Sequence, residues 1–177
     1  MGNTRRVSAG FYVLLFGIVV ASFLIHEAGH WLAGTALGYE MTFALNSVVS
    51  TTPLSPRDAM IVSAAGPIVT AIQGVVSFVL IVRRDVVGAY AVLFVAAMLR
   101  VMATVVSVSN PNDEARISLQ LGLGQWTLPI LVSGALIVLV VIASRTLRLG
   151  WRTNVLTYLV CTVTLSAVVG LDWMLKG

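Results

Sequence analysis

Charge is scarce in this sequence. Only 10% of the 177 residues are Asp, Glu, Lys or Arg, whereas an ordinary soluble domain carries about 25%. Hydrophobic residues make up 58% of the chain, which is more apolar surface than a soluble fold of this size can bury. A bilayer accepts such segments because lipid is itself an apolar solvent. The composition excludes an ordinary soluble domain and predicts an integral membrane protein.

Cysteine and histidine are scarce as well. Cys161 is the only cysteine and lies within an apolar run, so the chain offers neither a disulfide framework nor a thiolate metal site. The net charge of +4 comes mainly from arginines between apolar runs, as is typical of residues that flank membrane helices. The expected surroundings are therefore the lipid bilayer, and no nucleic-acid partner is expected.

Long apolar runs fill most of the chain, and a membrane helix needs about 20 mostly apolar residues. The sequence predicts an all-α membrane protein in which about five transmembrane helices form one bundle. We expect a single membrane-embedded domain over residues 1–177, with a core at 10–120 and accessory helices at 126–174. The predicted helices cover residues 10–33, 59–82, 86–107, 126–144 and 154–173.

The segment between the first two predicted helices, residues 39–56, is polar but has little charge. It is rich in Thr, Ser and Val and contains Pro53 and Pro56, a composition that favours a β-like loop over a helix. At membrane depth such a backbone is tolerated only where protein or a water-filled cavity covers it. The sequence therefore predicts a re-entrant or β-like loop after the first helix.

The positions of the arginines predict an orientation. Loops at one end of the bundle carry more basic residues than loops at the other. In membrane proteins the side with more Lys and Arg residues faces the cytoplasm. The N-terminus is then inside and the first helix points outward, in a multi-pass protein that we place in the cytoplasmic membrane of a prokaryote. The richer set is Arg5, Arg6, Arg83, Arg84, Arg145, Arg148 and Arg152, and the other set is Arg57, Arg116 and Lys176.

Residues 26–30 read His-Glu-Ala-Gly-His and lie inside the first predicted helix. Residues four apart share one face of a helix, so His26 and His30 can bind one metal ion, with zinc–nitrogen bonds of about 2.0–2.1 Å. Glu27 would then lie beside the metal, where a carboxylate can take a proton from a metal-bound water and pass it to a leaving amine. This pattern predicts a zinc site with Glu27 as the catalytic base.

The alternative interpretation of these residues is structural. Two polar side chains would then bond to neighbouring helices while Glu27 stays protonated. Ionisable groups inside an apolar helix are costly and usually functional, and His26 and His30 are the only histidines in the chain. We therefore favour the metal site.

A catalytic zinc site needs a third protein ligand and leaves its fourth position to water. The histidines lie toward the outgoing end of the first helix, and the third helix returns to that face just before residues 110–114. Asp113 is therefore the expected third ligand. Asn110 at an N-cap, Pro111 at the first helical position and two acids in the first turn also fit an ordinary helix start, and this is compatible because a helix start can present a ligand. The candidate carboxylates are Glu40, Asp58, Asp85, Asp113, Glu114 and Asp172.

Three elements, in this order, resemble the site-2 protease family of intramembrane zinc metalloproteases. The first is the His-Glu-Ala-Gly-His motif at 26–30, the second is Ala-Gly-Pro at 65–67, and the third is Asn-Pro-Asn-Asp at 110–113. The resemblance covers roughly residues 10–120. The first motif is specific, whereas each of the other two is weak when taken singly.

By this resemblance the zinc ligands would be His26, His30 and Asp113, and Glu27 would be the general base. Residues 39–56 would be similar to the family's membrane re-entrant loop, which helps to seat an extended substrate by β-pairing. The resemblance thus implies zinc as the cofactor and a transmembrane protein or peptide as the substrate.

The chain departs from the family pattern in three respects. Glu114 follows Asp113 where the family usually has Gly, so Glu114 is a rival or auxiliary ligand. Thr70 stands where an Asn commonly follows the Ala-Gly-Pro element. Family members also tend to place the site toward the cytoplasm, whereas the arginine pattern here places it toward the outside.

Two further polar residues stand out. Arg100 is a charge inside the third predicted helix and needs a partner, for which Asp172 is the candidate. For Arg100 we favour a structural pair over a contact with the transition state. Asn46, in the loop, is a candidate donor to a developing oxyanion.

Together these features predict an intramembrane zinc metalloendopeptidase that cleaves a membrane-spanning or membrane-adjacent protein with a zinc-activated water. The alternative is a membrane protein that binds a metal or a partner without catalysis. Glu27 argues against it, because a binding site needs no base. A metal transporter would spread polar ligands across the bilayer, whereas the candidate ligands here cluster toward one face.

Overall fold

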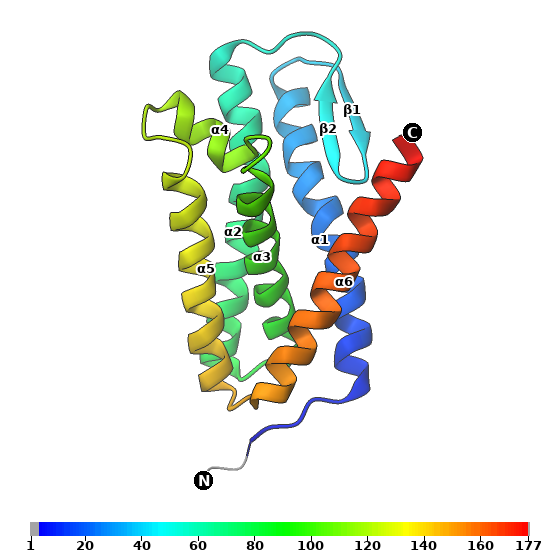
Figure 1. The fold of residues 1–177 in the computed structure, drawn as a ribbon, viewed down its shortest axis with the longest axis vertical. Helices are drawn as coiled ribbons and strands as arrows, with labels where there is room; N and C mark the ends of the chain where they lie inside the picture. The colour runs from blue at the N-terminus through cyan, green and yellow to red at the C-terminus, as the bar shows by residue number, and fades with distance from the viewer. Residues whose placement is uncertain (1–3, 177) are drawn as a thin grey trace.

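The computed structural model describes residues 4–176 and gives them six helices and one two-stranded sheet (Figure 1). Five of these helices are long and apolar enough to cross a membrane. The predicted all-α membrane fold is therefore confirmed, and the short helix α4 is added to it. The elements are α1 Ala9–Ala36, β1 Met41–Ala44, β2 Ser47–Ser50, α2 Pro56–Arg84, α3 Val87–Val106, α4 Asp113–Gln120, α5 Thr127–Thr146 and α6 Trp151–Lys176.

The five long helices run alternately up and down the bundle (Figure 1). Helix α3 lies in the middle and packs against α1, α2, α5 and α6. In its most apolar window 61% of the residues are buried, against 28% to 33% in the other four helices. The outer helices expose large apolar side chains such as Val13, Leu131 and Val163, which suits lipid as the surrounding solvent.

Strands β1 and β2 form an antiparallel hairpin directly after α1, so the predicted β-like loop is confirmed. Gly38 follows the end of α1 with a φ of 89°, a conformation that glycine adopts readily. Met41 pairs with Ser50 and Ala44 with Ser47, which leaves a two-residue turn between the strands. The hairpin packs against the end of α1 and so covers the part of the bundle that holds the histidines (Figure 1).

The basic residues separate between the two ends of the bundle, as the sequence predicts. Nη1 of Arg5 lies 2.9 Å from Oδ2 of Asp85, and the backbone N–H of Arg5 donates to the carbonyl oxygen of Arg148. These contacts bring the N-terminal segment, the α2–α3 turn and the α5–α6 turn to one end. The hairpin and α4 lie at the opposite end, together with Arg57 and Arg116 (Figure 1).

Candidate metal centre

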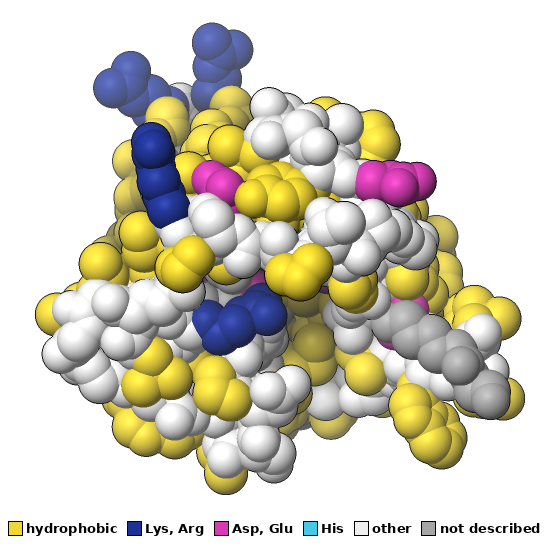
Figure 2. Space-filling view, turned by 90° about the horizontal axis from the view of Figure 1, so that it is seen from above, with side chains coloured by type: hydrophobic (Ala, Val, Ile, Leu, Met, Phe, Trp, Pro, Cys, Tyr) yellow, Lys and Arg dark blue, Asp and Glu magenta, His cyan; other side chains and the backbone are white. Residues whose placement is uncertain are grey.

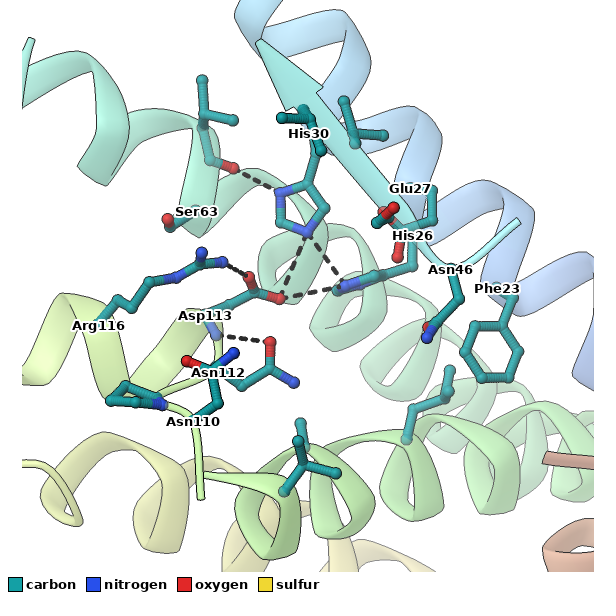
Figure 3. A pocket seen from close by; sticks show the side chains of 18 of the residues that line it. Phe23, His26, Glu27, His30, Asn46, Ser63, Asn110, Asn112, Asp113 and Arg116 are labelled. Carbon is teal, nitrogen blue, oxygen red and sulfur yellow. Dashed lines mark hydrogen bonds and ion pairs between the residues drawn. The ribbon is translucent and has the colours of Figure 1, made fainter. Parts of the chain in front are cut away.

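His26 and His30 lie one turn apart on α1, and both side chains are buried. Their rings meet edge to face with centroids 4.7 Å apart, and their Nε2 atoms are 3.1 Å apart. The spacing in the sequence thus brings two imidazole nitrogens toward one point (Figure 3).

Asp113 completes this group from the first residue of α4. Its Oδ2 lies 3.3 Å from Nε2 of His26 and 3.3 Å from Nε2 of His30. In a tetrahedral zinc site with bonds of about 2.0–2.1 Å, neighbouring ligand atoms lie about 3.3 Å apart. The three buried side chains can therefore hold a metal ion, and a donor set of two imidazoles and one carboxylate fits zinc.

Hydrogen bonds to the Nδ1 atoms orient the two rings. Nδ1 of His30 lies 2.6 Å from the carbonyl oxygen of Val62, which can only accept, so His30 donates there. Thr70 Oγ1 donates to the carbonyl oxygen of Gly66 and lies 3.1 Å from Nδ1 of His26, so it accepts from that ring. Each ring therefore keeps a lone pair on Nε2, the atom that faces the other candidate ligands.

Helix α2 comes close to the rings at Gly66, the middle residue of the Ala-Gly-Pro element. A Cβ at this position would overlap Nε2 of His30 and would lie 2.5 Å from Cε1 of His26. Gly29 allows the same approach from α1, because a Cβ there would lie 3.2 Å from the carbonyl oxygen of Ala65. The element is thus a close helix contact that makes room for the imidazoles.

The predicted helix start after α3 exists, but its boundary differs from the prediction. Asn112 rather than Asn110 is the N-cap, and its side chain accepts from the backbone N–H of Asp113 at 3.0 Å. Pro111 precedes the cap instead of taking the first helical position, so that detail of the prediction is wrong. Nη2 of Arg116 holds Oδ1 of Asp113 at 2.6 Å and leaves Oδ2 toward the histidines.

The surroundings of Asp113 stabilise its ionised form. Burial would raise the pKa of this carboxyl, but the rings of His26 and His30 beside it hold the pKa well below its usual range. The ionised carboxylate is the form that ligates a metal, so the group is prepared for a cation.

Arg100 and Glu114 form a buried ion pair beside the ligand group, with Nη1 2.9 Å from Oε1. The sequence predicts Asp172 as the partner of Arg100, and that prediction is wrong. Asp172 instead accepts from the backbone N–H of Asn46 at 3.2 Å. Glu114 belongs to the pair and not to the group that could hold a metal, which leaves Asp113 as the candidate third ligand.

A cavity of about 900 Å³ lies beside the three candidate ligands. Its wall comes from α1, the hairpin, α2, α3, α4 and the C-terminal half of α6, so one accessory helix contributes to the site. Glu27 is 6% exposed and lines this cavity next to the histidines (Figure 3). Asn46 and Arg116 line it on opposite sides of the rings. The end face that carries the hairpin is largely uncharged and is hollowed near its centre (Figure 2).

Two contacts of the ligand group are absent from the sequence predictions. Thr70 follows Gly66 by four residues, and that spacing puts both on one face of α2. The hydroxyl of Thr70 therefore faces the same histidine ring that Gly66 approaches. Arg116 follows Asp113 by three residues, a spacing that predicts an ion pair once the helix is known to start at Asp113.

Zinc sites with three protein ligands and one open position are catalytic, whereas structural sites are closed by four. Among residues 4–176, His26, His30 and Asp113 are the only group of side chains that could hold a metal ion, and they offer three ligand atoms. Glu27 lies in the wall of the adjoining cavity of about 900 Å³. A comparison of the chain with protein-family models, with curated proteins and with solved structures finds no match.

Proposed function

We propose that this protein is an intramembrane zinc metalloendopeptidase of the site-2 protease type. The observation that carries the proposal is the convergence of His26, His30 and Asp113 beside Glu27 and a cavity, inside a bundle of apolar helices. A site that only binds a metal needs neither a carboxylate base nor a cavity beside it. The combination favours hydrolysis at the metal.

Zinc is the proposed cofactor because the ligand set and the spacing of its atoms suit a tetrahedral ion. A bound zinc ion would lower the pKa of a water molecule toward neutrality and polarise the scissile carbonyl. His26 and His30 would hold the ion through Nε2, and Asp113 would hold it through Oδ2. The hydrogen bonds at the Nδ1 atoms keep both rings in the required tautomer.

Glu27 is the proposed general base. It follows the first ligand in the chain, is buried and lines the cavity. Its carboxylate would take a proton from the attacking water and deliver it to the nitrogen of the leaving amine. Glu27 would then end the cycle in the ionised form in which it began.

The proposed substrate is a membrane-spanning or membrane-adjacent protein segment in an extended conformation. All four residues of β2, Ser47–Ser50, line the cavity. In the described part of the chain the sheet has only two strands, so β2 has one edge that is not paired within the sheet. Such an edge can hold an extended peptide through backbone hydrogen bonds, which supports this substrate class.

The proposed location is the cytoplasmic membrane of a prokaryote, with lipid around the five apolar helices. The end with Arg5, Arg148 and the other basic turns would face the cytoplasm. The metal centre lies toward the opposite end, so cleavage would occur in the outer half of the bilayer. No nucleic acid has a role in this proposal.

The test compares cells that express the parent protein with cells that express Glu27→Gln. Mass-spectrometric mapping of new protein N-termini in the membrane fraction should find cleavage in or beside a transmembrane segment with the parent only. Both purified proteins should contain about one zinc ion per chain, and His26→Ala should contain none. Glu40→Gln is the matched control, because it makes the same change at an exposed position outside the cavity wall.

Each outcome separates the candidates. If the parent and Glu27→Gln both hold zinc and the cells that express them show the same protein N-termini, the protein binds a metal without catalysis. A parent that holds no zinc, even after zinc is supplied, would overturn the metal site and the proposed activity with it. Cleavage by the parent and by Glu40→Gln, but not by Glu27→Gln, is the result that we expect.

A further inference from the structure

Arg100 is a buried charge inside a membrane-spanning helix. Its side chain is 4% exposed, and α3 carries no other charged residue. Charges at membrane depth are expensive and mark sites that use them. Glu114 offsets the charge through its contact of 2.9 Å with Nη1. This pair explains how the arginine is tolerated, but it does not explain why the arginine lies beside the metal centre.

The guanidinium of Arg100 contacts two of the candidate ligands. Its Nη1 is 3.9 Å from Oδ2 of Asp113, and its Nη2 is 3.4 Å from both ring nitrogens of His26. Arg100 also lines the cavity. The cation therefore lies at the boundary between the ligand group and the space in which a substrate would bind.

Arg100 has unused hydrogen-bonding capacity. A guanidinium carries five N–H donors. The Nε of Arg100 is buried and has no hydrogen-bond partner among residues 4–176. Buried donors without partners are rare in native proteins, and a bound ligand, a water molecule or a catalytic role accounts for them. The guanidinium thus keeps a donor that no described residue uses, which leaves capacity for a group that binds beside it.

In peptide hydrolysis the scissile carbonyl oxygen becomes negatively charged in the transition state, and a donor near the metal stabilises that charge in addition to the metal itself. Arg116 is engaged with Oδ1 of Asp113, the carboxylate oxygen that does not face the histidines. Asn46 reaches the cavity from the hairpin turn, across from Arg116 (Figure 3). Arg100 touches both His26 and Asp113, so it is the better placed donor.

We propose that Arg100 is a second catalytic residue, whose guanidinium donates a hydrogen bond to the scissile carbonyl oxygen as that oxygen becomes an oxyanion. The inference rests on the proposed peptidase function. Arg100 keeps its proton throughout, because guanidinium groups are not deprotonated in proteins, so its contribution is electrostatic. Glu114 is a positioning residue that holds the guanidinium and offsets its charge.

A purely structural role for the pair makes a different prediction. If the pair only joins α3 to α4, removing one charge leaves the other buried and unpaired, whereas removing both restores a neutral site. If Arg100 acts on the reacting carbonyl, removing both charges still leaves the reaction without its donor. A double-mutant cycle of Arg100→Gln, Glu114→Gln and the two together distinguishes these roles.

The cycle uses the segment that the parent cleaves and a phosphinic analogue of it, in which a tetrahedral anionic group replaces the scissile amide. We expect Arg100→Gln and the double variant to lose about 10²- to 10³-fold in kcat with little change in KM. The affinity for the phosphinic analogue, measured by calorimetry in detergent, should fall by a similar factor. Glu114→Gln retains the donor and should keep much more of kcat. Arg100→Lys keeps the positive charge and should recover part of the loss.

Zinc content and affinity are measured for every variant. The double variant should hold zinc like the parent. If kcat of the double variant recovers to the level of Glu114→Gln, the pair is structural and the catalytic role is overturned. Loss of zinc from the double variant would also contradict the proposal, because Arg100 would then act on the metal site. A zinc-loaded parent that cleaves nothing would instead defeat the proposed function itself.

Discussion

The orientation of His26 depends on a hydroxyl group of another helix. Thr70 Oγ1 lies 3.1 Å from Nδ1 of His26 and accepts a hydrogen bond from it. The lone pair of Nε2 is thereby left free to bind a metal ion. Outer hydrogen bonds of this kind fix the tautomer of a metal-binding histidine and raise its basicity. At the scale of single residues, the candidate metal centre therefore includes a hydrogen-bond partner besides the three candidate ligands.

Thr70→Val should weaken zinc binding by about 10- to 100-fold, because a methyl group replaces the acceptor of the His26 N–H. Thr70→Ser keeps the hydroxyl and should bind zinc much as the parent does. Competition with a chromophoric chelator measures the affinity. Thr164→Val is the matched control, since that buried hydroxyl donates to the carbonyl oxygen of Val160 within α6. Unchanged affinity in Thr70→Val would mean that other contacts hold the ring.

Gly66→Ala should disrupt the metal centre, because the added Cβ would overlap both imidazoles. Overpacking of this kind costs about 1–3 kcal/mol, and here the rings that must move are the candidate ligands. We expect a large loss of zinc content, measured by atomic absorption on the purified protein. Gly134→Ala on α5 is the control, since a Cβ there meets no atom within 4 Å. A zinc-replete Gly66→Ala protein would contradict the close approach of α2.

The sequence predicts that four residues come together at the site, and this prediction requires little knowledge of the three-dimensional structure. His26, Glu27 and His30 share one helical turn, and the returning third helix brings Asp113 to the same end. The partner of Arg100 could not be predicted in this way. A shift of one residue turns a side chain about 100° around a helix, so the pairing depends on the exact rotation of α3.

Helix α4 carries a candidate ligand although it has only eight residues. Isolated helices of this length are marginal in water, so α4 depends on its cap and on its contacts with neighbouring helices. Ser107 Oγ at the end of α3 accepts from the backbone N–H of Asn112 at 3.1 Å and thereby fixes the start of α4. Because Asp113 is the first residue of α4, its position depends on the contacts that fix the start of this helix.

Asn112→Ala should weaken zinc binding by about fivefold, because losing an N-cap costs about 1 kcal/mol and here the loss loosens the candidate ligand Asp113. Chelator competition measures the change. Ser55→Ala removes the side-chain cap of α2, a helix of 29 residues that carries no candidate ligand, and should leave zinc affinity unaltered. If both variants weakened zinc alike, the effect would come from general destabilisation and not from α4.

Most elements could be predicted because long apolar runs and the composition of residues 39–56 are strong local signals. The first residue of α4 is difficult to predict from the sequence, since Asn110 and Asn112 are both good N-caps within one short stretch. The contact of Asn112 with Ser107 on α3 selects between them. That contact belongs to the tertiary structure, so local propensity does not contain it.

In the whole molecule, the candidate metal centre and the basic turns lie toward opposite ends. The contacts of Arg5 with Asp85 and Arg148 gather three basic segments at one end, and the hairpin covers the site at the other. If the basic end faces the cytoplasm, the proposed peptidase would cut its substrate in the outer half of the bilayer. The orientation would therefore decide which substrates the proposed peptidase can reach, and it can be measured directly.

Ser8→Cys and Thr52→Cys place a thiol at each end of the bundle. Both positions are exposed, and the side chain of Ser8 makes no cap hydrogen bond. The native Cys161 is fully buried, so the parent serves as the unlabelled control. In intact cells a membrane-impermeant maleimide should label Thr52→Cys and should label Ser8→Cys only after permeabilisation, because the positive side stays in the cytoplasm. The reverse pattern would place the metal centre toward the cytoplasm, and the basic turns would then be on the outside in spite of their charge.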